Sequence, residues 1–160
     1  MSAIDLSLMN KTALLTGAAS GIGRAIADAL AAHGCSVAIQ DIDLDAARVA
    51  ADEITRASGR RAVALGGDLT DPSIVDTLVV QTREQLGRID ILVNNGSIQV
   101  EKPIEEQSLE EIERQTRANQ IVPLLLIARI APAVVERKWG RILNIGSVQQ
   151  LSGAPSMIAY

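Results

Sequence analysis

The sequence has little cysteine and no cluster of positive charge. Cys35 is the only cysteine among 160 residues, so an internal disulfide is excluded, and a reducing compartment is compatible with the sequence. We expect Cys35 to be a small buried residue at the start of a strand. The formal net charge is −4, and the 15 lysines and arginines are scattered along the chain. Nucleic acid binding is therefore not expected, because it needs a basic patch on one face.

Segments that direct a chain to a membrane or across one are also lacking. The N-terminus, MSAIDLSLMNK, has an acidic residue before any basic one and no uninterrupted apolar core, so a secretory signal is not predicted. The longest apolar stretch, residues 121–135, is too short to span a bilayer and contains Arg129 and two prolines. With 48% hydrophobic residues the chain is nonetheless typical of a globular protein. We therefore expect a cytoplasmic protein with no membrane partner, and we predict no metal site.

Short apolar runs alternate with amphipathic segments along the chain. Runs with the length and composition of strands lie at residues 13–16, 36–40, 62–65, 89–93 and 141–145. The first helical face would comprise Ile22, Ala25, Ile26, Ala29 and Leu30, ending at Gly34. Asp71 and Pro72 would be the N-cap and first-turn proline of a second helix, whose face would comprise Ile74, Val75, Leu78, Val79 and Leu86. The alternation predicts an α/β fold, a doubly wound parallel sheet in a single domain.

The first predicted strand runs into the segment TGAASGIGRA, which places Gly17, Gly21 and Gly23 at a strand-to-helix turn. A backbone that approaches a pyrophosphate has no room for a Cβ atom, and the following helix N-terminus offers unpaired N–H groups. The spacing differs from the general dinucleotide fingerprint, G-x-G-x-x-G. Because the turn lies between a strand and an amphipathic helix, we interpret it as a phosphate-binding turn rather than an ordinary flexible one.

Asp41 follows the second predicted strand, 24 residues after Gly17. A carboxylate at this place can accept hydrogen bonds from both ribose hydroxyls of an adenosine, and it would repel a 2′-phosphate. The alternative role, N-cap of the next helix, can be taken by Asp43, which leaves Asp41 free. The cofactor predicted from this acid is NAD, in preference to NADP.

Five motifs follow one another in register: TGAASGIG, Asp41, GGDLT with Asp68, NNG at residues 94–96, and GRILNIGS followed by a tyrosine. In this order and spacing the chain resembles the short-chain dehydrogenase/reductase family over all 160 residues. The resemblance implies a Rossmann-like sheet with strand order 3-2-1-4-5. It also implies that this dinucleotide-binding domain is incomplete at its C-terminus, because the family continues beyond the tyrosine.

The resemblance assigns cofactor contacts to the carboxyl ends of the strands. It implies that the pyrophosphate lies against Gly17, Ser20, Gly21, Ile22 and Gly23. It further implies that Asp41 holds the adenine ribose, that Asp68 and Leu69 hold the adenine, and that Asn95 and Gly96 hold the nicotinamide half. The family commonly has NNAG at this last motif, whereas Gly96 and Ser97 replace its alanine and glycine here. The turn thus keeps a glycine but moves it by one position.

Hydride transfer between an alcohol carbon and nicotinamide needs a group that takes the hydroxyl proton and a donor for the developing oxyanion. The resemblance implies that Ser147 is the donor, and that Tyr160 is the base in oxidation and the acid in reduction. A free phenol has a pKa of about 10. The family lowers this pKa with the cofactor and a lysine four positions after the tyrosine, a position beyond this sequence.

Asn119 has a role that the sequence supports independently. Pro123 has no N–H group, so the carbonyl of Asn119 lacks its usual helical donor and is open to a water molecule. The resemblance implies that this water completes a proton relay. Residues 121–135 are apolar nearly all round, which predicts a partner subunit over the outer face and hence a homodimer or homotetramer.

Two functions stay open at this point. The first is an enzyme that transfers hydride between NAD(H) and a small-molecule secondary alcohol or ketone; the second is an NAD-binding module without turnover, because the sequence lacks the lysine. Substrate contacts are predicted for Ser147, Gln149 and Tyr160. Gln149 would suit a hydroxyl-rich sugar or polyol, although a surface position is an equal alternative for it. A 3-oxoacyl thioester is the other candidate substrate, but reductases of that kind often use NADP.

Overall fold

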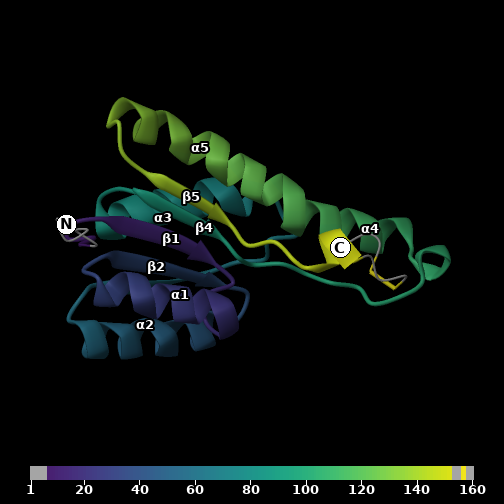
Figure 1. Cartoon of the computed structure of the whole chain (residues 1–160), viewed down its shortest axis with the longest axis horizontal. Helices are drawn as coiled ribbons and strands as arrows, with labels where there is room; N and C mark the ends of the chain where they lie inside the picture. Colours follow the sequence, from purple (N-terminus) through teal and green to yellow (C-terminus); the bar gives the residue numbers. More distant parts are fainter. Residues whose placement is uncertain (1–6, 153–155, 158–160) are drawn as a thin grey trace.

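The computed structural model describes residues 7–152 and 156–157. Its five strands form one parallel sheet in the order β3-β2-β1-β4-β5 (Figure 1). They are β1 (Thr12–Thr16), β2 (Ser36–Asp41), β3 (Ala62–Gly66), β4 (Ile91–Asn94) and β5 (Arg141–Asn144). The predicted α/β class, the parallel sheet and the 3-2-1-4-5 order are confirmed.

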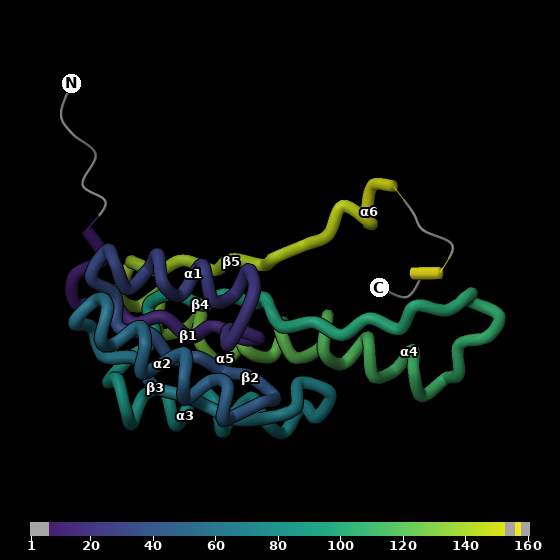
Figure 2. The backbone as a smooth tube through the Cα atoms, turned by 90° about the horizontal axis from the view of Figure 1, so that it is seen from below, coloured from purple at the N-terminus to yellow at the C-terminus, as the bar shows by residue number. Residues whose placement is uncertain are grey.

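Helices cover both faces of the sheet (Figures 1 and 2). The helices α1 (Gly21–Ala32) and α2 (Leu44–Ser58) pack on one face, and α3 (Ile74–Leu86) and α5 (Val122–Glu136) pack on the other. Between β4 and α5 lie a short 3₁₀ turn (Ile104–Glu106), α4 (Leu109–Thr116) and a π-helical turn (Arg117–Ile121). A short helix, α6 (Gln149–Ser152), follows β5.

The strands β1 to β4 are largely apolar because each of them contributes to two cores, whereas β5 is exposed along its length. In β1, Ala13 and Leu15 pack with α1 and α2, whereas Leu14 between them packs with α3 and α5. All three residues are fully buried. Successive side chains of a strand point to opposite faces, so a strand covered on both sides has no polar alternation. Cys35 is buried immediately before β2, as expected.

The helix α1 ends as predicted but buries a different face. Gly34, at φ +100, donates to Ala31 O, and the next residue donates to Leu30 O, which closes the helix end in a Schellman pattern. The predicted face is wrong in part, because Ile22, Ala25 and Ala29 are exposed. The buried positions are Gly23, Ala27 and Ala31, one residue further along. These small residues bring α1 close to the sheet, a packing advantage that the hydrophobic spacing does not reveal.

The predicted start of α3 is also wrong by two residues. Ser73, not Asp71, is the N-cap, and the Asp71 carboxylate accepts hydrogen bonds from the backbone N–H and the hydroxyl of Ser73. The side chain of Asp71 thus stabilises a turn before the helix, which competes with capping. The prediction for Asp43 is confirmed, since its carboxylate caps α2 by accepting from Ala46 N at 2.9 Å.

A continuous helical stretch runs from Leu109 to Glu136. Its length and its mean hydropathy, 1.7 over the most apolar 18-residue window, would allow it to cross a membrane, but helices that cover a sheet have the same properties. One face, with Val122, Leu126 and Ile130, is buried against the sheet. Leu124 on the outer side is 65% exposed. The stretch is thus a sheet-covering helix with an apolar outer face.

Candidate active site

A cleft of about 400 Å³ opens at the carboxyl ends of β1 to β4. This volume is within the range of small-molecule sites in proteins. Its lining comprises Gly17, Ser20, Ile22, Gln40, Asp41, Ile42, Gly67, Asp68, Leu69, Asn95, Gly96, Ser97 and Ile98. The cleft therefore brings together the predicted cofactor residues from four separate turns. Gly21 and Gly23 belong to the same glycine turn but do not line the cleft.

The glycine turn passes very close to the segment after β4. A Cβ atom on Gly17, which has φ +58, would lie 2.6 Å from the Cα atom of Gly96, and one on Gly23 would lie 2.5 Å from Nδ2 of Asn95. The same Asn95 amide donates to the carbonyls of Gly17 at 2.8 Å and Thr16 at 3.2 Å. The glycine of the NNG motif, Gly96, thus meets the backbone of another glycine, and the approach is too close for a Cβ atom on Gly17.

The start of α1 fits a pyrophosphate. Ser20 is extended at the N-cap, and its side chain makes no capping hydrogen bond within the described residues. A Cβ atom on Gly21 would meet nothing within 4 Å, so there is free space beside the first turn. The N–H groups of this turn and the positive end of the helix dipole are consequently available to an anion. A dinucleotide could place its phosphates here, with Ile22 and Ser20 as the flanking side chains.

The charge of the cleft is negative. Asp41 lies at the tip of β2, where its Oδ2 accepts from Ala19 N at 3.1 Å and its Oδ1 accepts from Asp43 N at 3.2 Å. Asp68 is the other charged residue in the described lining, and no lysine or arginine is part of it. Arg24 is the basic residue nearest in sequence to the glycine turn. It is paired with Asp28 at 3.1 Å and with Glu53 of α2 at 2.9 Å.

Sequence reasoning missed several lining residues, of which Gln40 is the most informative. This glutamine is 1% exposed, and its Oε1 accepts from Gly17 N at 3.3 Å while its Nε2 donates to Gly67 O at 2.8 Å. A glutamine within the apolar run SVAIQ was the available signal, because a buried amide needs partners. Ile42, Gly67, Ser97 and Ile98 carried no comparable signal.

Asn119 lies in the π-helical turn between α4 and α5. Its Nδ2 donates to Ile98 O and its Oδ1 accepts from Ile98 N, both at 2.9 Å. Ile98 lines the cleft, so the side chain of Asn119 fixes part of the cleft wall. Pro123, four residues further on, cannot donate to the carbonyl of Asn119. Widened turns of this kind are frequent at functional sites.

The segment after β4 is held at alternate residues by amide side chains. Beyond Ile98, the fully buried Gln115 accepts from Val100 N at 3.0 Å and donates to Gln107, whose own Nε2 donates to Lys102 O at 3.0 Å. The backbone N–H of Lys102 donates to Ser156 O at 3.0 Å. The cleft wall is thus connected to the chain segment between Ser147 and Tyr160.

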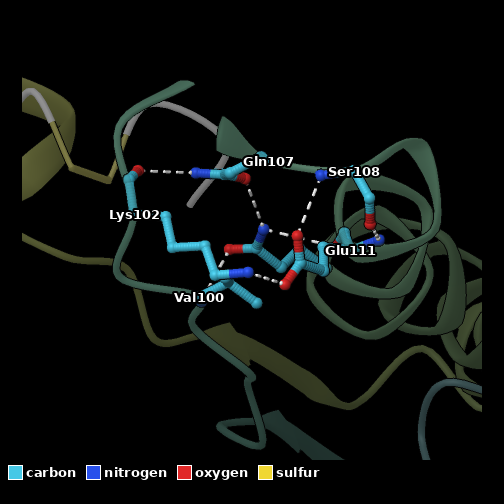
Figure 3. A network of polar contacts seen from close by, with 6 residues as sticks. Val100, Lys102, Gln107, Ser108 and Glu111 are labelled. Carbon is cyan, nitrogen blue, oxygen red and sulfur yellow. Dashed lines mark hydrogen bonds and ion pairs between the residues drawn. The ribbon is translucent and has the colours of Figure 1, made fainter. Parts of the chain in front are cut away.

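Figure 3 shows the polar network at the far end of this segment. Ser108 and Glu111 form a capping box at the start of α4, and the Glu111 carboxylate also pairs with the ammonium group of Lys102. The hydrogen bond from Lys102, followed by that from the backbone of Ser108, lowers the pKa of Glu111. The segment 98–108 therefore has fixed attachments at both ends.

Of the predicted catalytic residues, Asn119 precedes α5 and Ser147 follows β5, and neither is part of the described lining of the cleft. Ser147 is half-buried, and its hydroxyl accepts from Gln149 N at 3.2 Å, which leads the chain into α6. Gln149 is also half-buried. Tyr160 lies outside the described residues, so its pairing with Ser147 stays a prediction.

The cleft thus combines a glycine turn with a carboxylate at the tip of β2, Asn119 holds part of its wall, and a family model described as short chain dehydrogenase matches residues 11–160. The chain belongs to the short-chain dehydrogenase family. This confirms the resemblance seen in the five motifs. Among curated relatives, the sorbitol dehydrogenase of Cereibacter sphaeroides is 40% identical to this chain over 143 residues, a match that covers 89% of this chain and 54% of that protein.

Solved structures of similar fold differ in cofactor. The L-sorbose reductase of Gluconobacter frateurii, complexed with NADPH and L-sorbose, matches with TM-score 0.93 and 27% identity over 98% of this chain and 60% of its own. A 3-oxoacyl (acyl-carrier-protein) reductase from Agrobacterium tumefaciens with NADP bound gives 0.91 and 31%, covering 99% and 62%. An NAD⁺-bound xylitol dehydrogenase gives 0.86 and 27%, covering 95% and 58%. This chain thus spans less than two thirds of the length of each of these relatives.

Proposed function

We propose that this chain is the cofactor-binding part of an oxidoreductase that transfers hydride between NAD(H) and a secondary alcohol or its ketone. The observation that carries the proposal is the cleft itself, in which an uncapped helix N-terminus and a carboxylate at the tip of β2 line the same space. These two groups match the pyrophosphate and the adenosine ribose of a dinucleotide. The family supports a nicotinamide cofactor.

The choice of NAD over NADP rests on the charge of the lining. Asp41 and Asp68 are acidic, and the described lining has no basic side chain that could pair with a 2′-phosphate. The guanidinium group of Arg24 is already occupied by Asp28 and Glu53. Because relatives with either cofactor share this fold, the fold alone does not decide the matter. The two carboxylates favour NAD.

In the proposed reaction, the nicotinamide ring, when bound, accepts or supplies the hydride. The hydroxyl of Ser147 would donate a hydrogen bond to the substrate oxygen, and Tyr160 would take the proton from that oxygen in oxidation or return it in reduction. Asn119 would act through its main-chain carbonyl, which Pro123 leaves without the usual helical donor, by holding a water that relays the proton. The side chain of Asn119 would meanwhile keep Ile98 in the cleft wall.

The proposed substrate is a sugar or polyol. Gln149, close after Ser147, would contribute an amide to hydroxyl groups, and a sorbitol dehydrogenase and an L-sorbose reductase are among the relatives. A 3-oxoacyl thioester is the alternative, since a 3-oxoacyl reductase has the same fold. We further propose that the protein is cytoplasmic and forms a homodimer or homotetramer through α5, whose outer residues Leu124 and Val135 are exposed.

The test is a parallel measurement of binding and turnover. NADH binding is followed by its fluorescence, and NADH formation is followed with sorbitol, xylitol and simple secondary alcohols. Ser147→Ala should lower turnover about 100-fold, the usual effect of removing one oxyanion donor, with little change in NADH affinity. The matched control is Ser152→Ala, a serine exposed in α6 that should leave turnover unchanged.

The outcomes separate the two candidate functions. Tight NADH binding without turnover on any substrate would favour a binding module over an enzyme. Failure of the unmodified protein to bind NADH would contradict both candidates. Equal turnover in Ser147→Ala and the unmodified protein would remove Ser147 from the proposed chemistry.

A further inference from the structure

Gln40 connects two walls of the cleft that belong to strands two places apart. The glycine turn follows β1 and the turn at Gly67–Leu69 follows β3, with β2 between them in the sheet. The last β1–β2 register pair is Thr16 with Gln40, and the last β2–β3 pair is Asp41 with Gly66. Beyond these pairs, the Gln40 side chain reaches both turns, accepting from Gly17 N and donating to Gly67 O.

The chemistry of the link requires an amide. Glutamine carries a hydrogen-bond acceptor and a donor at the same end of an uncharged side chain, so it can accept from one wall and donate to the other. A glutamate in its ionised form could accept but not donate, and a methionine of similar length could do neither in comparable strength. Because Gln40 is 1% exposed, water cannot easily replace either bond.

Each of the two glycines that Gln40 contacts is held through both its N–H group and its carbonyl. The carbonyl of Gly17 accepts from Nδ2 of Asn95 at 2.8 Å, so Gly17 is held by one amide through its N–H group and by another through its carbonyl. Gly67 donates its N–H group to Asp41 O at 3.1 Å and receives Gln40 at its carbonyl. The Gln40 side chain thus joins the two turns directly, in addition to the backbone bonds that tie each turn to β2.

We propose that Gln40 is a positioning residue for the adenosine half of the cofactor, an inference that rests on the proposed NAD(H) function. The walls it joins carry Gly17 on one side and Asp68 and Leu69 on the other, and Asp41 stands next to it at the tip of β2. By fixing the gap between the walls before binding, Gln40 removes the cost of ordering them when adenosine enters.

The experiment uses ADP-ribose, which contains the adenosine and both phosphates but no nicotinamide. Its dissociation constant is measured by calorimetry for the unmodified protein, Gln40→Met and Gln115→Met. We expect Gln40→Met to weaken ADP-ribose and NADH by the same factor, about tenfold, which corresponds to the loss of one hydrogen bond's worth of organisation. Amide hydrogen exchange at Gly17 should become faster in the same variant.

The control makes the same chemical change at a different buried glutamine. Gln115 is fully buried and has hydrogen bonds to Val100, Gln107 and Glu111, but it does not line the cleft. Gln115→Met should destabilise the fold without weakening ADP-ribose. If Gln40→Met does not fold at the assay temperature, Gln40→Asn replaces it, because its shorter side chain keeps an amide that cannot reach both walls.

Three results would overturn the inference. They are an unchanged ADP-ribose affinity in a folded Gln40 variant, an equal loss in Gln115→Met, and a loss for NADH that greatly exceeds the loss for ADP-ribose. Each of these leaves the proposed function intact. By contrast, an unmodified protein that binds neither NADH nor ADP-ribose would overturn the proposed function, and the inference about Gln40 with it.

Discussion

Replacing Asp41 by asparagine tests whether a single carboxylate selects the cofactor. Asparagine keeps the size of the side chain and an oxygen that can accept from Ala19 N, the bond at 3.1 Å that ties Asp41 to the glycine turn. The substitution therefore removes the negative charge and one backbone hydrogen bond, that from Asp43 N, while the side chain keeps its size. The measured quantities are the dissociation constants of NADH and NADPH by fluorescence titration, at one ionic strength.

The expected size of the effect follows from two contributions. A 2′-phosphate with a charge near −2, at about 4 Å from the carboxylate in a water-filled cleft, is repelled by about 2 kcal/mol. Removing that repulsion should tighten NADPH about 30-fold. The ribose hydroxyls of NADH would exchange charge-assisted hydrogen bonds for neutral ones, a loss of about 1 kcal/mol or about fivefold. The NADH preference should therefore fall about 150-fold.

Asp43→Asn is the matched control, because it removes the same charge two residues further on. Asp43 caps α2 and is exposed, and asparagine caps a helix as well as aspartate does, so the variant should keep its stability while its cofactor preference changes little. An equal shift of preference in both variants would refute a specific role for Asp41. So would an unmodified protein that binds NADPH as tightly as NADH.

Other predictions concern the core, the capping box and the glycine turn. Burial, aided by the charge of a nearby aspartate, raises the pKa of the Cys35 thiol to about 12. At about pH 8, iodoacetamide should therefore modify this thiol roughly 1,000-fold more slowly in the native than in the unfolded protein. Fast modification of the native protein would contradict this. The pKa of Glu111 is lowered by Lys102 and Ser108 in the folded state, so its contribution to stability should be complete above its unfolded pKa of about 4.3 and be lost as the pH falls through the folded value. Urea unfolding of Glu111→Gln should thus differ from the unmodified protein at neutral pH but converge with it in acid. Gly23→Ala, whose Cβ atom would approach Asn95 to 2.5 Å, should destabilise the fold by about 1–3 kcal/mol and weaken NADH, measured by thermal unfolding and titration; unchanged values would show that the turn can yield.

The strands could be predicted from the sequence because burial on both faces leaves continuous apolar runs such as ALLT. The prediction was less accurate where a polar residue serves tertiary structure. β4 is predicted from residue 89, but it begins at Ile91, and the buried Asp90 carboxylate just before it accepts from Thr12 N and from Arg88. The partners of such a group come from segments far apart in the chain, which local periodicity cannot report.

The candidate site shows the same division. Glycines and a carboxylate after strands are readable because parallel topology brings strand ends to one edge. The roles of Gln40 and Gln115 cannot be predicted in this way, because each is a buried amide that bonds to backbone groups 15 to 27 residues away in the sequence. The start of α4, by contrast, can be predicted locally, because Ser108 followed by Glu111 is a capping box.

The bond from Asn95 to Gly17 has a consequence for the order of events during synthesis. It joins residues 78 positions apart, and β1 lies between β2 and β4 in the finished sheet. At a translation rate of about 5–20 residues per second, Asn95 is made about 4–16 seconds after Gly17. Once Gln40 has been made, the nascent chain has one of the two amides that hold its glycine turn, and it lacks the other until Asn95 follows. The cleft consequently becomes complete only after the segment that follows β4 has been made, well after its glycine turn.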